Sequence, residues 1–332
     1  MVPENKQPVV RKALRAAFGV DQYEAMEPLE KGLSSALVYR IRVGGKSYVL
    51  RVITRTDAQA DPTYYFSCMA KAAEAGIAPP IRYLDREDRV SITDFVEGRP
   101  FGAGEALTGM PRLLRRLHTL PNFPFRIDYL EKMEGFMQSL RKARLLPEQA
   151  LHPLYEAYDR VARVYPRMEP ASLVSCHNDL KPENILFDGT RPWLVDWEGA
   201  FLNDRYLDLA VVANFVVREE TQEDDFLAAY FGRPATEQER ARLFLMAQLL
   251  HLHYFTLFLL VGSGHKPVDL YQEAPPAFRE FHDRMWEGQI DLSRRETQLH
   301  YALVHRGEFL RKAGTARLEA SLRLLAQSSR SA

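Results

Sequence analysis

The sequence predicts an α+β fold of two lobes, a small β-rich N-terminal lobe (N-lobe) and a larger, mainly helical C-terminal lobe (C-lobe). Alternating β-branched and aromatic residues and short apolar runs occur up to about residue 95. The segment FVEGRP (95–100) then breaks the pattern with a glycine and a proline, and leucines recur at helical spacing after it. We therefore expect residues 1–96 to form the N-lobe and residues 97–332 to form the C-lobe.

Composition excludes several classes of protein. The 332 residues can form two lobes with real cores, and 46% apolar with 27% charged residues is typical of soluble globular proteins. Lys plus Arg equals Asp plus Glu at 44 each, which argues against a nucleic-acid partner. Cys68 and Cys176 lie far apart without a CxxC motif, which excludes a disulfide scaffold and fits a cytoplasmic location. No feature specifies an oligomeric state.

The N-lobe elements follow from turn signals. Residues 37–53 alternate around Gly44-Gly45, which predicts a β-hairpin. Residues 63–75 predict a helix, which the following glycine and two prolines end. Two further short strands are expected at 81–84 and 89–95.

The C-lobe is expected to be helical through residue 165 and again from residue 208, because leucines repeat there at i, i+3 and i+4. In this lobe we expect strands only at 185–187 and 193–196. The apolar stretch 243–261 is long enough to cross a bilayer, yet it contains a glutamine, two histidines and a threonine. We interpret it as a buried core helix and expect no stable membrane insertion. The N-terminus has no apolar signal core, so we do not expect secretion.

One polar cluster stands before a short strand. HNDLKPENIL (177–186) contains Asp179 and Asn184, and Asp196 follows after a second apolar run. A hairpin of the two runs would bring Asp196 back beside Asn184. Their oxygens are hard ligands that suit magnesium on a nucleotide phosphate, and Asp179 would be free to accept a proton from a hydroxyl. Taken alone, Asp-x4-Asn could equally be a turn.

The same residues carry a family resemblance. Residues 177–179 with Asn184, followed by 196–198, are similar to the catalytic loop and metal-binding Asp of the protein-kinase-like superfamily. The closest resemblance is to its small-molecule branch, the choline/ethanolamine kinases and aminoglycoside phosphotransferases. It covers roughly residues 28–262 and is very specific at 177–198. Looser matches occur in the expected order. They are a phosphate loop at 32–35, a third strand at 48–52, a hinge at 92–100 and a bracing segment at 205–210.

The resemblance implies ATP and Mg²⁺ as cofactors. It assigns Asp179 as the catalytic base and lets Lys181 stabilise the transferring phosphoryl group. It assigns Asn184 and Asp196 to the magnesium ion. Structural support of the loop is assigned to a further pair, His177 and Asp208.

It also implies a nucleotide site in the N-lobe. Arg51 would contact the phosphates, and backbone groups from Phe95 to Glu97 would bind adenine. Ser34 and Ser35 would cover the phosphates. One departure concerns the acid that normally pairs with the third-strand cation. Its expected place falls near Tyr65, which leaves Asp61 as a substitute.

The acceptor is less well specified. A quaternary ammonium needs an aromatic cage with an acid nearby, and Trp197, Glu198 and Tyr206 are candidates together with Phe201, Tyr254 and Trp286. The same aromatic residues could equally form the C-lobe core.

The expected function is that of an ATP-dependent small-molecule kinase, a phosphotransferase with an alcohol group as acceptor. The resemblance favours a small amine-bearing metabolite, as in choline/ethanolamine kinases. An aminoglycoside- or sugar-type O-phosphotransferase is the first alternative, and an ATP-binding pseudokinase module is the second. A protein substrate is disfavoured, because the short gap between Asp196 and Asp208 leaves no room for a peptide-docking loop.

Overall fold

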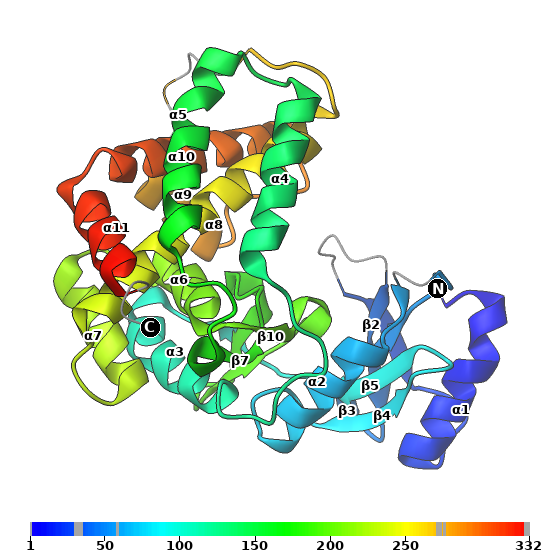
Figure 1. Cartoon of the computed structure of the whole chain (residues 1–332). Coiled ribbons are helices and arrows are strands. Elements are labelled where there is room, and N and C mark those ends of the chain that lie inside the picture. Colours follow the sequence, from blue (N-terminus) through cyan, green and yellow to red (C-terminus); the bar gives the residue numbers. More distant parts are fainter. Residues whose placement is uncertain (1, 30–35, 58–59, 270–273, 275–276, 329–332) are drawn as a thin grey trace.

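The computed structural model describes residues 2–29, 36–57, 60–269, 274 and 277–328. It has the bilobal arrangement that the sequence predicts. A small sheet with one covering helix lies at the lower right of Figure 1, and the helices of the larger lobe occupy the left and top. The predicted phosphate loop, with Ser34 and Ser35, falls outside the described residues.

Antiparallel strands in the order β1-β2-β3-β5-β4 form the N-lobe sheet. Their bounds are β1 (Ala25–Pro28), β2 (Leu37–Val43), β3 (Lys46–Val52), β4 (Ile81–Asp85) and β5 (Val90–Asp94). The predicted hairpin is present as β2 and β3, with Gly44 and Gly45 both at positive φ in the turn. Glycine suits these positions because it lacks the Cβ that makes positive φ costly.

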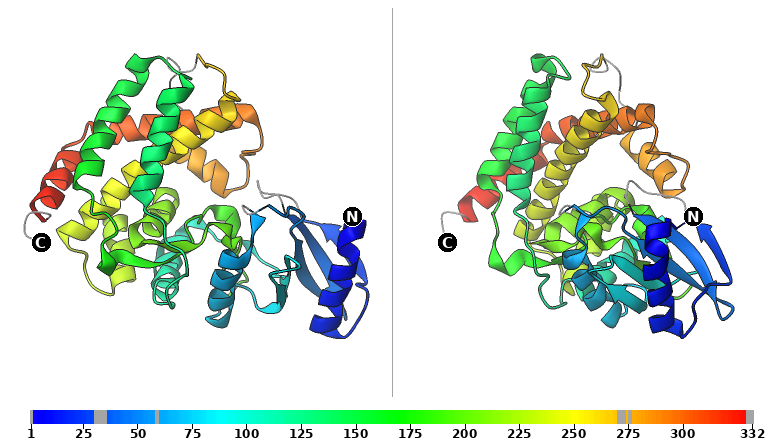
Figure 2. Two further views of the ribbon diagram at one scale, coloured as in Figure 1. Left: turned by 45° about the vertical axis from the view of Figure 1, so that its right-hand side comes forward. Right: turned by 90° about the vertical axis from the view of Figure 1, so that its right-hand side faces the viewer.

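The strand alternation gives the sheet two faces. Tyr39, Ile41, Leu50 and Val52 are buried against helix α1 (Gln7–Phe18), which the sequence did not predict. The alternate residues of the same strands, among them Arg51, lie on the opposite face, which faces the C-lobe (Figure 2). The period of two therefore places a cation at the lobe interface.

Helix α2 (Thr63–Glu74) joins the two lobes, as Figure 1 shows. Its first turns pack in the N-lobe, whereas Cys68 and Ala72 belong to the C-lobe core. The thiol of Cys68 donates to the carbonyl of Ala200 at 3.7 Å. After the helix, the carbonyl of Ile77 accepts a hydrogen bond from the amide of Leu194 at 2.9 Å. The lobes are therefore fixed to each other along this side.

The C-lobe helices pack around the long helix α8 (Glu237–Ser263), which contacts α4, α5, α6, α10 and α11. The other bounds are α3 (Ala103–Leu117), α4 (Tyr129–Ala143), α5 (Glu148–Val164), α6 (Arg205–Val216), α7 (Glu220–Phe231), α9 (Phe278–Trp286), α10 (Arg295–Ala313) and α11 (Ala316–Ser328). Helix α8 is long and apolar enough to span a membrane, but 78% of its apolar window is buried inside the protein. It is the core helix that its sequence predicts.

The C-lobe contains more strands than the sequence predicted. The two expected strands are β8 (Ile185–Phe187) and β9 (Pro192–Leu194). The structure adds β6 (Arg99–Pro100), which pairs with β8, and the antiparallel pair of β7 (Leu173–Cys176) with β10 (Phe201–Asp204). The expectation of only two strands was wrong because segments of two to four residues are too short to display a period.

A group of buried histidines lies between α8, α9 and α10. The Nδ1 atoms of His251 and His305 are 3.0 Å apart, and His282 packs beside them. Burial lowers the pKa of His282 to about 3, and burial also lowers the pKa values of His251 and His305. The folded protein therefore holds these rings neutral.

We predict that this group makes the protein sensitive to acid. The folded pKa of His282 lies below its unfolded value of 6.5. Between these two pKa values the unfolded chain binds a proton at this ring and the folded chain does not. The contribution of the neutral ring to the free energy of unfolding is fully present above the unfolded pKa. It is lost as pH falls toward the folded pKa. His282→Gln should reduce the loss between about pH 7.5 and about pH 5.5 by about 1.4 kcal/mol. Urea unfolding measures this, and the exposed His152→Gln variant, which should keep the full loss, is the control.

Candidate active site

Asp208 fixes the backbone of the polar loop. It lies in the first turn of α6, fully buried, and its carboxylate accepts hydrogen bonds from the amides of His177 at 2.9 Å and Asn178 at 2.7 Å. The His118 ring lies 3.1 Å away, and its other nitrogen lies 2.7 Å from the hydroxyl of Tyr230. Asn178 has a φ of 65°, a left-handed conformation that asparagine tolerates better than most residues. The loop turns sharply there.

The turn places Asp179 beside Asn184, which ends a short 3₁₀ helix (Pro182–Asn184). The side-chain amide of Asn184 donates to the carbonyl and to Oδ2 of Asp179, at 2.8 and 2.9 Å. Lys181 Nζ lies 3.4 Å from the same carboxylate oxygen. Burial works against the charge of Lys181, but Asp179 and its acidic neighbours outweigh it and raise its pKa. The proposed base therefore has a fixed orientation and a cation beside it.

The β8–β9 hairpin brings the second acid back to this loop. The amide of Val195 donates to the carbonyl of Asn184 at 3.0 Å, and His177 Nε2 lies 3.0 Å from the carbonyl of Val195. Asp196 follows with a φ of 63°. The hairpin geometry that the sequence suggested is therefore present, and His177 anchors the strand that leads to Asp196.

Asn184 and Asp196 fit a hard cation. The NH₂ group of Asn184 donates both of its hydrogen bonds to Asp179, which leaves Oδ1 of Asn184 available as a metal ligand. Oδ1 of Asp196 is buried and accepts no hydrogen bond within the described part of the chain. A buried carboxylate oxygen needs a cation nearby. Arg51 Nη1 lies 3.5 Å from Oδ1 as an ion pair but donates no hydrogen bond to it, so this oxygen is still available to ligate a metal ion. Oxygen donors of this kind suit Mg²⁺.

Arg51 reaches this acid from the N-lobe. Its Nη1 lies 3.5 Å from Oδ1 of Asp196, and its Nη2 donates to Glu198. Burial opposes its charge, but Glu198 and the other neighbours outweigh burial and raise the pKa of Arg51. An acidic partner of Arg51, Glu198, thus follows the expected metal ligand Asp196 in the C-lobe. Asp61, the substitute that the sequence suggested, lies just before α2 and accepts hydrogen bonds from the backbone amide and hydroxyl of Thr63 instead.

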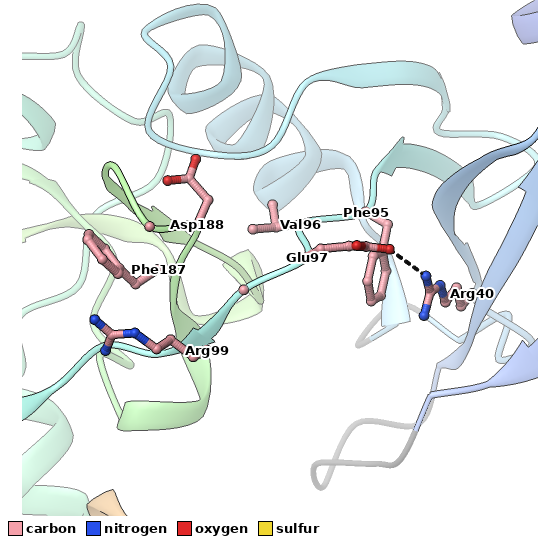
Figure 3. Close-up of a pocket in the computed structure, with 9 residues that line it drawn as sticks. Arg40, Phe95, Val96, Glu97, Arg99, Phe187 and Asp188 are labelled. Carbon is pink, nitrogen blue, oxygen red and sulfur yellow. Dashed lines mark hydrogen bonds and ion pairs between the residues drawn. The ribbon is translucent and has the colours of Figure 1, made fainter.

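A cavity of about 630 Å³ lies at the hinge between the lobes. Figure 3 shows Glu97 pointing toward Arg40, whose Nη2 lies 2.7 Å from Oε1 of Glu97. The Arg40 guanidinium also lies 4.3 Å from the ring centre of Phe95. The backbone groups of Val96 and Glu97 have no hydrogen-bond partner in the region that the structure describes. The predicted adenine-binding segment therefore lines a cavity and has free backbone groups.

A second cavity, of about 250 Å³, lies beside Asp179; we name it the acceptor pocket. Helices α4 and α8 form much of its wall through Tyr129, Lys132, His253 and Tyr254. Of these, only Tyr254 is among the candidate cage residues predicted from the sequence. Nothing near the polar loop points to α4, because that helix begins about fifty residues earlier in the chain.

The three proposed cage residues do not line this pocket. Trp197 is buried, donates to the carbonyl of Leu194 at 3.1 Å and packs against His177. Tyr206 is buried under the guanidinium of Arg242, and Glu198 binds Arg51. Phe201, from the wider set of candidates, does line the pocket. The aromatic residues near the loop are thus largely core, which was the simpler of the two interpretations.

Comparison with known proteins identifies relatives. The model of the phosphotransferase enzyme family matches residues 25–244. LicA of Haemophilus influenzae (strain Rd) is 24% identical over 226 residues, which is 65% of this chain and 83% of LicA.

Solved structures share the fold. A choline/ethanolamine kinase family protein from Mesorhizobium loti has a TM-score of 0.65 and 22% identity, over 97% of this chain and 99% of its own. A spectinomycin phosphotransferase, solved with ADP and spectinomycin, has a TM-score of 0.56 and 13% identity, over 90% of this chain and 98% of its own. These likenesses confirm the bilobal protein-kinase-like fold.

We predict that Asp208→Ala destabilises the protein. The change removes the acceptor for two backbone amides of the loop, one buried and one partly buried, and the partner of one buried ring nitrogen. Leaving such donors unsatisfied should cost about 3 kcal/mol or more. Urea unfolding tests this against Asp225→Ala, an exposed aspartate on α7. Equal stability of the two variants would show that Asp208 does not brace the loop.

Proposed function

The chain belongs to the phosphotransferase enzyme family, and we propose that it transfers the γ-phosphate of ATP, bound with Mg²⁺, to a hydroxyl of a small molecule in the acceptor pocket. One observation carries the proposal. Asp179 lines the acceptor pocket and, through Asn184, adjoins the pair of oxygen ligands that fits magnesium. A proton acceptor, an acceptor site and a metal site are therefore adjacent, which phosphoryl transfer requires.

Each polar residue has a role in this reaction. Asp179 accepts the proton of the hydroxyl as its oxygen attacks the terminal phosphorus and the bond to ADP breaks. Asn184 orients that carboxylate, and Lys181 and Arg51 offset negative charge around the transferred group. Mg²⁺, when held by Asn184 and Asp196, supplies further positive charge on the phosphates.

The nucleotide site extends from the hinge to Arg51. The free backbone groups of Val96 and Glu97 support adenine binding at the hinge cavity. Arg51 lies on the face of the sheet that faces the metal ligands, which supports contact with the phosphates.

The acceptor class has two candidates in the family. A choline kinase, LicA of Streptococcus pneumoniae, also shares the fold, and its name and that of the Mesorhizobium loti protein support choline or ethanolamine. Phe201, Tyr129 and Tyr254 in the acceptor pocket could face such a cation. An aminoglycoside-type acceptor is supported by the spectinomycin phosphotransferase. A cytoplasmic enzyme acting on a free metabolite, without nucleic acid or protein as substrate, is part of the proposal.

The first test is ADP release from Mg-ATP with a panel of alcohols. Asp179→Asn should lower kcat at least about 100-fold, because the attacking hydroxyl loses its base. ATP affinity, measured by calorimetry, should stay within a factor of about 3, since Asp179 lies outside the proposed adenine and metal contacts. The matched control is Glu183→Gln in the same loop, whose exposed side chain is given no role. Full activity of Asp179→Asn would refute the assignment of the base. ATP binding by the wild-type protein without turnover of any alcohol would favour the pseudokinase alternative.

A second prediction concerns the hinge. A Cβ added at Gly98 would lie 2.7 Å from the carbonyl oxygen of Phe187, so Gly98→Ala must push the hinge away from β8. We expect ATP affinity to fall roughly tenfold, equivalent to about 1.4 kcal/mol, because the adenine-binding backbone moves. Gly104→Ala, where a Cβ meets no atom within 4 Å, is the control. An unchanged ATP affinity in Gly98→Ala would place adenine away from this cavity.

A further inference from the structure

Lys132 places a positive charge in the acceptor pocket. It lies in the first turn of α4, which Asp128 caps by accepting from the amides of Leu130 and Glu131 at 3.0 and 3.3 Å. Arg167 binds that aspartate at 3.0 Å and so fixes the start of the helix. Lys132 lines the pocket from this anchored turn, and its Nζ lies 5.9 Å from the ring centre of Phe136.

Among the described residues, the ammonium group of Lys132 has the Phe136 ring as a neighbour but no anionic or hydrogen-bonding partner. No carboxylate lies within ion-pair distance of it, and no hydrogen bond from its Nζ is formed within the described ranges. The side chain is exposed to solvent and lines the wall of the acceptor pocket. Its pKa is lowered chiefly by desolvation, while the charge of Asp179 acts in the other direction. A cation placed like this is available to a ligand.

The rest of the pocket does not balance this charge. Among the described lining residues, Lys132, Asp179 and His253 are the ionisable side chains besides two tyrosines. Burial, with the charge of Lys132, lowers the pKa of His253 to about 3, so this ring is neutral near pH 7. Asp179 already has Asn184 and Lys181 as partners. No further carboxylate in the described lining could pair with an ammonium substrate.

Two buried polar atoms of the lining also lack partners. The hydroxyl of Tyr129 and Nδ1 of His253 are both buried without a hydrogen bond in the described structure. Tyr129 is only 5% exposed, and its ring stacks on His253 at 5.8 Å between centroids. Buried polar groups normally have a partner, so their lack of one in a cavity wall indicates a polar ligand. A hydroxyl can donate to a ligand oxygen, as the ammonium of Lys132 can.

We infer that Lys132 makes the acceptor pocket selective for an alcohol that also carries a carboxylate or phosphate group. The inference rests on the proposed phosphotransfer to a hydroxyl and specifies its substrate class. An anionic oxygen forms a charge-assisted hydrogen bond with Lys132, and the hydroxyl of Tyr129 can donate to the same ligand. A quaternary ammonium would meet a like charge in a pocket whose described acid is the base itself. An acceptor with both charges also belongs to this class, because only its anionic group needs Lys132.

The test compares alcohols that differ mainly in charge: choline, ethanolamine, glycerol, glycerate, glycerol phosphate and homoserine. Both ADP release and direct binding by calorimetry are measured on the full chain with Mg-ADP or Mg-ATP. We expect at least one acid-bearing alcohol to exceed glycerol and choline roughly tenfold in kcat/KM and in affinity. Glycerate and glycerol phosphate separate a carboxylate from a phosphate as the recognised group.

Variants of Lys132 then test whether the preference for acid-bearing alcohols depends on the charge of this side chain. Lys132→Met should raise KM and Kd for the acid-bearing alcohol roughly tenfold or more, with a smaller change in kcat, and should raise KM for glycerol much less. Lys132→Arg should restore most of the affinity because it keeps the charge. Lys142→Met is the matched control, since Lys142 is exposed in the last turn of the same helix and is absent from the pocket lining.

The outcomes separate the two proposals. Preferred binding of choline or ethanolamine, unaffected by Lys132→Met, overturns the anionic acceptor and leaves phosphotransfer intact. A loss of kcat with unchanged KM in Lys132→Met also overturns it, because Lys132 would then balance charge in the reaction. Binding of an acid-bearing alcohol that depends on Lys132, without any ADP release, supports the inference about the pocket and refutes the proposed phosphotransfer.

Discussion

The site depends on one buried carboxylate. Asp208 is fully buried and carries two backbone hydrogen bonds from consecutive loop residues, with a histidine ring as third neighbour. An unpaired acid there would be very costly, so the loop can only adopt a backbone that directs its amides at Asp208. This backbone is the left-handed turn at Asn178, and it determines where Asp179 emerges. The position of the proposed base is thus a consequence of satisfying the hydrogen-bonding needs of another, buried acid.

The second constraint joins the lobes. Arg51 comes from the N-lobe sheet, and two carboxylates that it contacts, those of Asp196 and Glu198, come from the segment after β9 in the C-lobe. Because a buried guanidinium needs anions, this pairing couples the placement of the sheet to the placement of Asp196. Helix α2 restrains the same interface by packing in both cores. The lobes are therefore held together on both sides of the region where phosphates are proposed to bind.

Local patterns made part of this structure predictable. The hairpin of β2 and β3, helix α2 and the β8–β9 hairpin are each encoded by residues adjacent in the chain, and all three are present. The partner of Arg51 was not found, because it lies 147 residues away and no period relates the two. Strands β7 and β10 were missed for a similar reason, since each is short and is stabilised by a distant partner. Sequence patterns report local geometry, whereas these features arise from packing between remote segments.

The same distinction separates the reaction from its substrate. The groups proposed for phosphoryl transfer lie almost entirely within residues 177–198. A resemblance in that segment is therefore enough to suggest the type of reaction. The acceptor pocket is walled mainly by α4 and α8, one before this segment and one after it, and its charge is set by Lys132. A protein can therefore keep the loop of a choline kinase relative and still present a cation where choline would need an anion. The charge of the pocket wall, more than the likeness of the loop, determines which alcohol can approach Asp179.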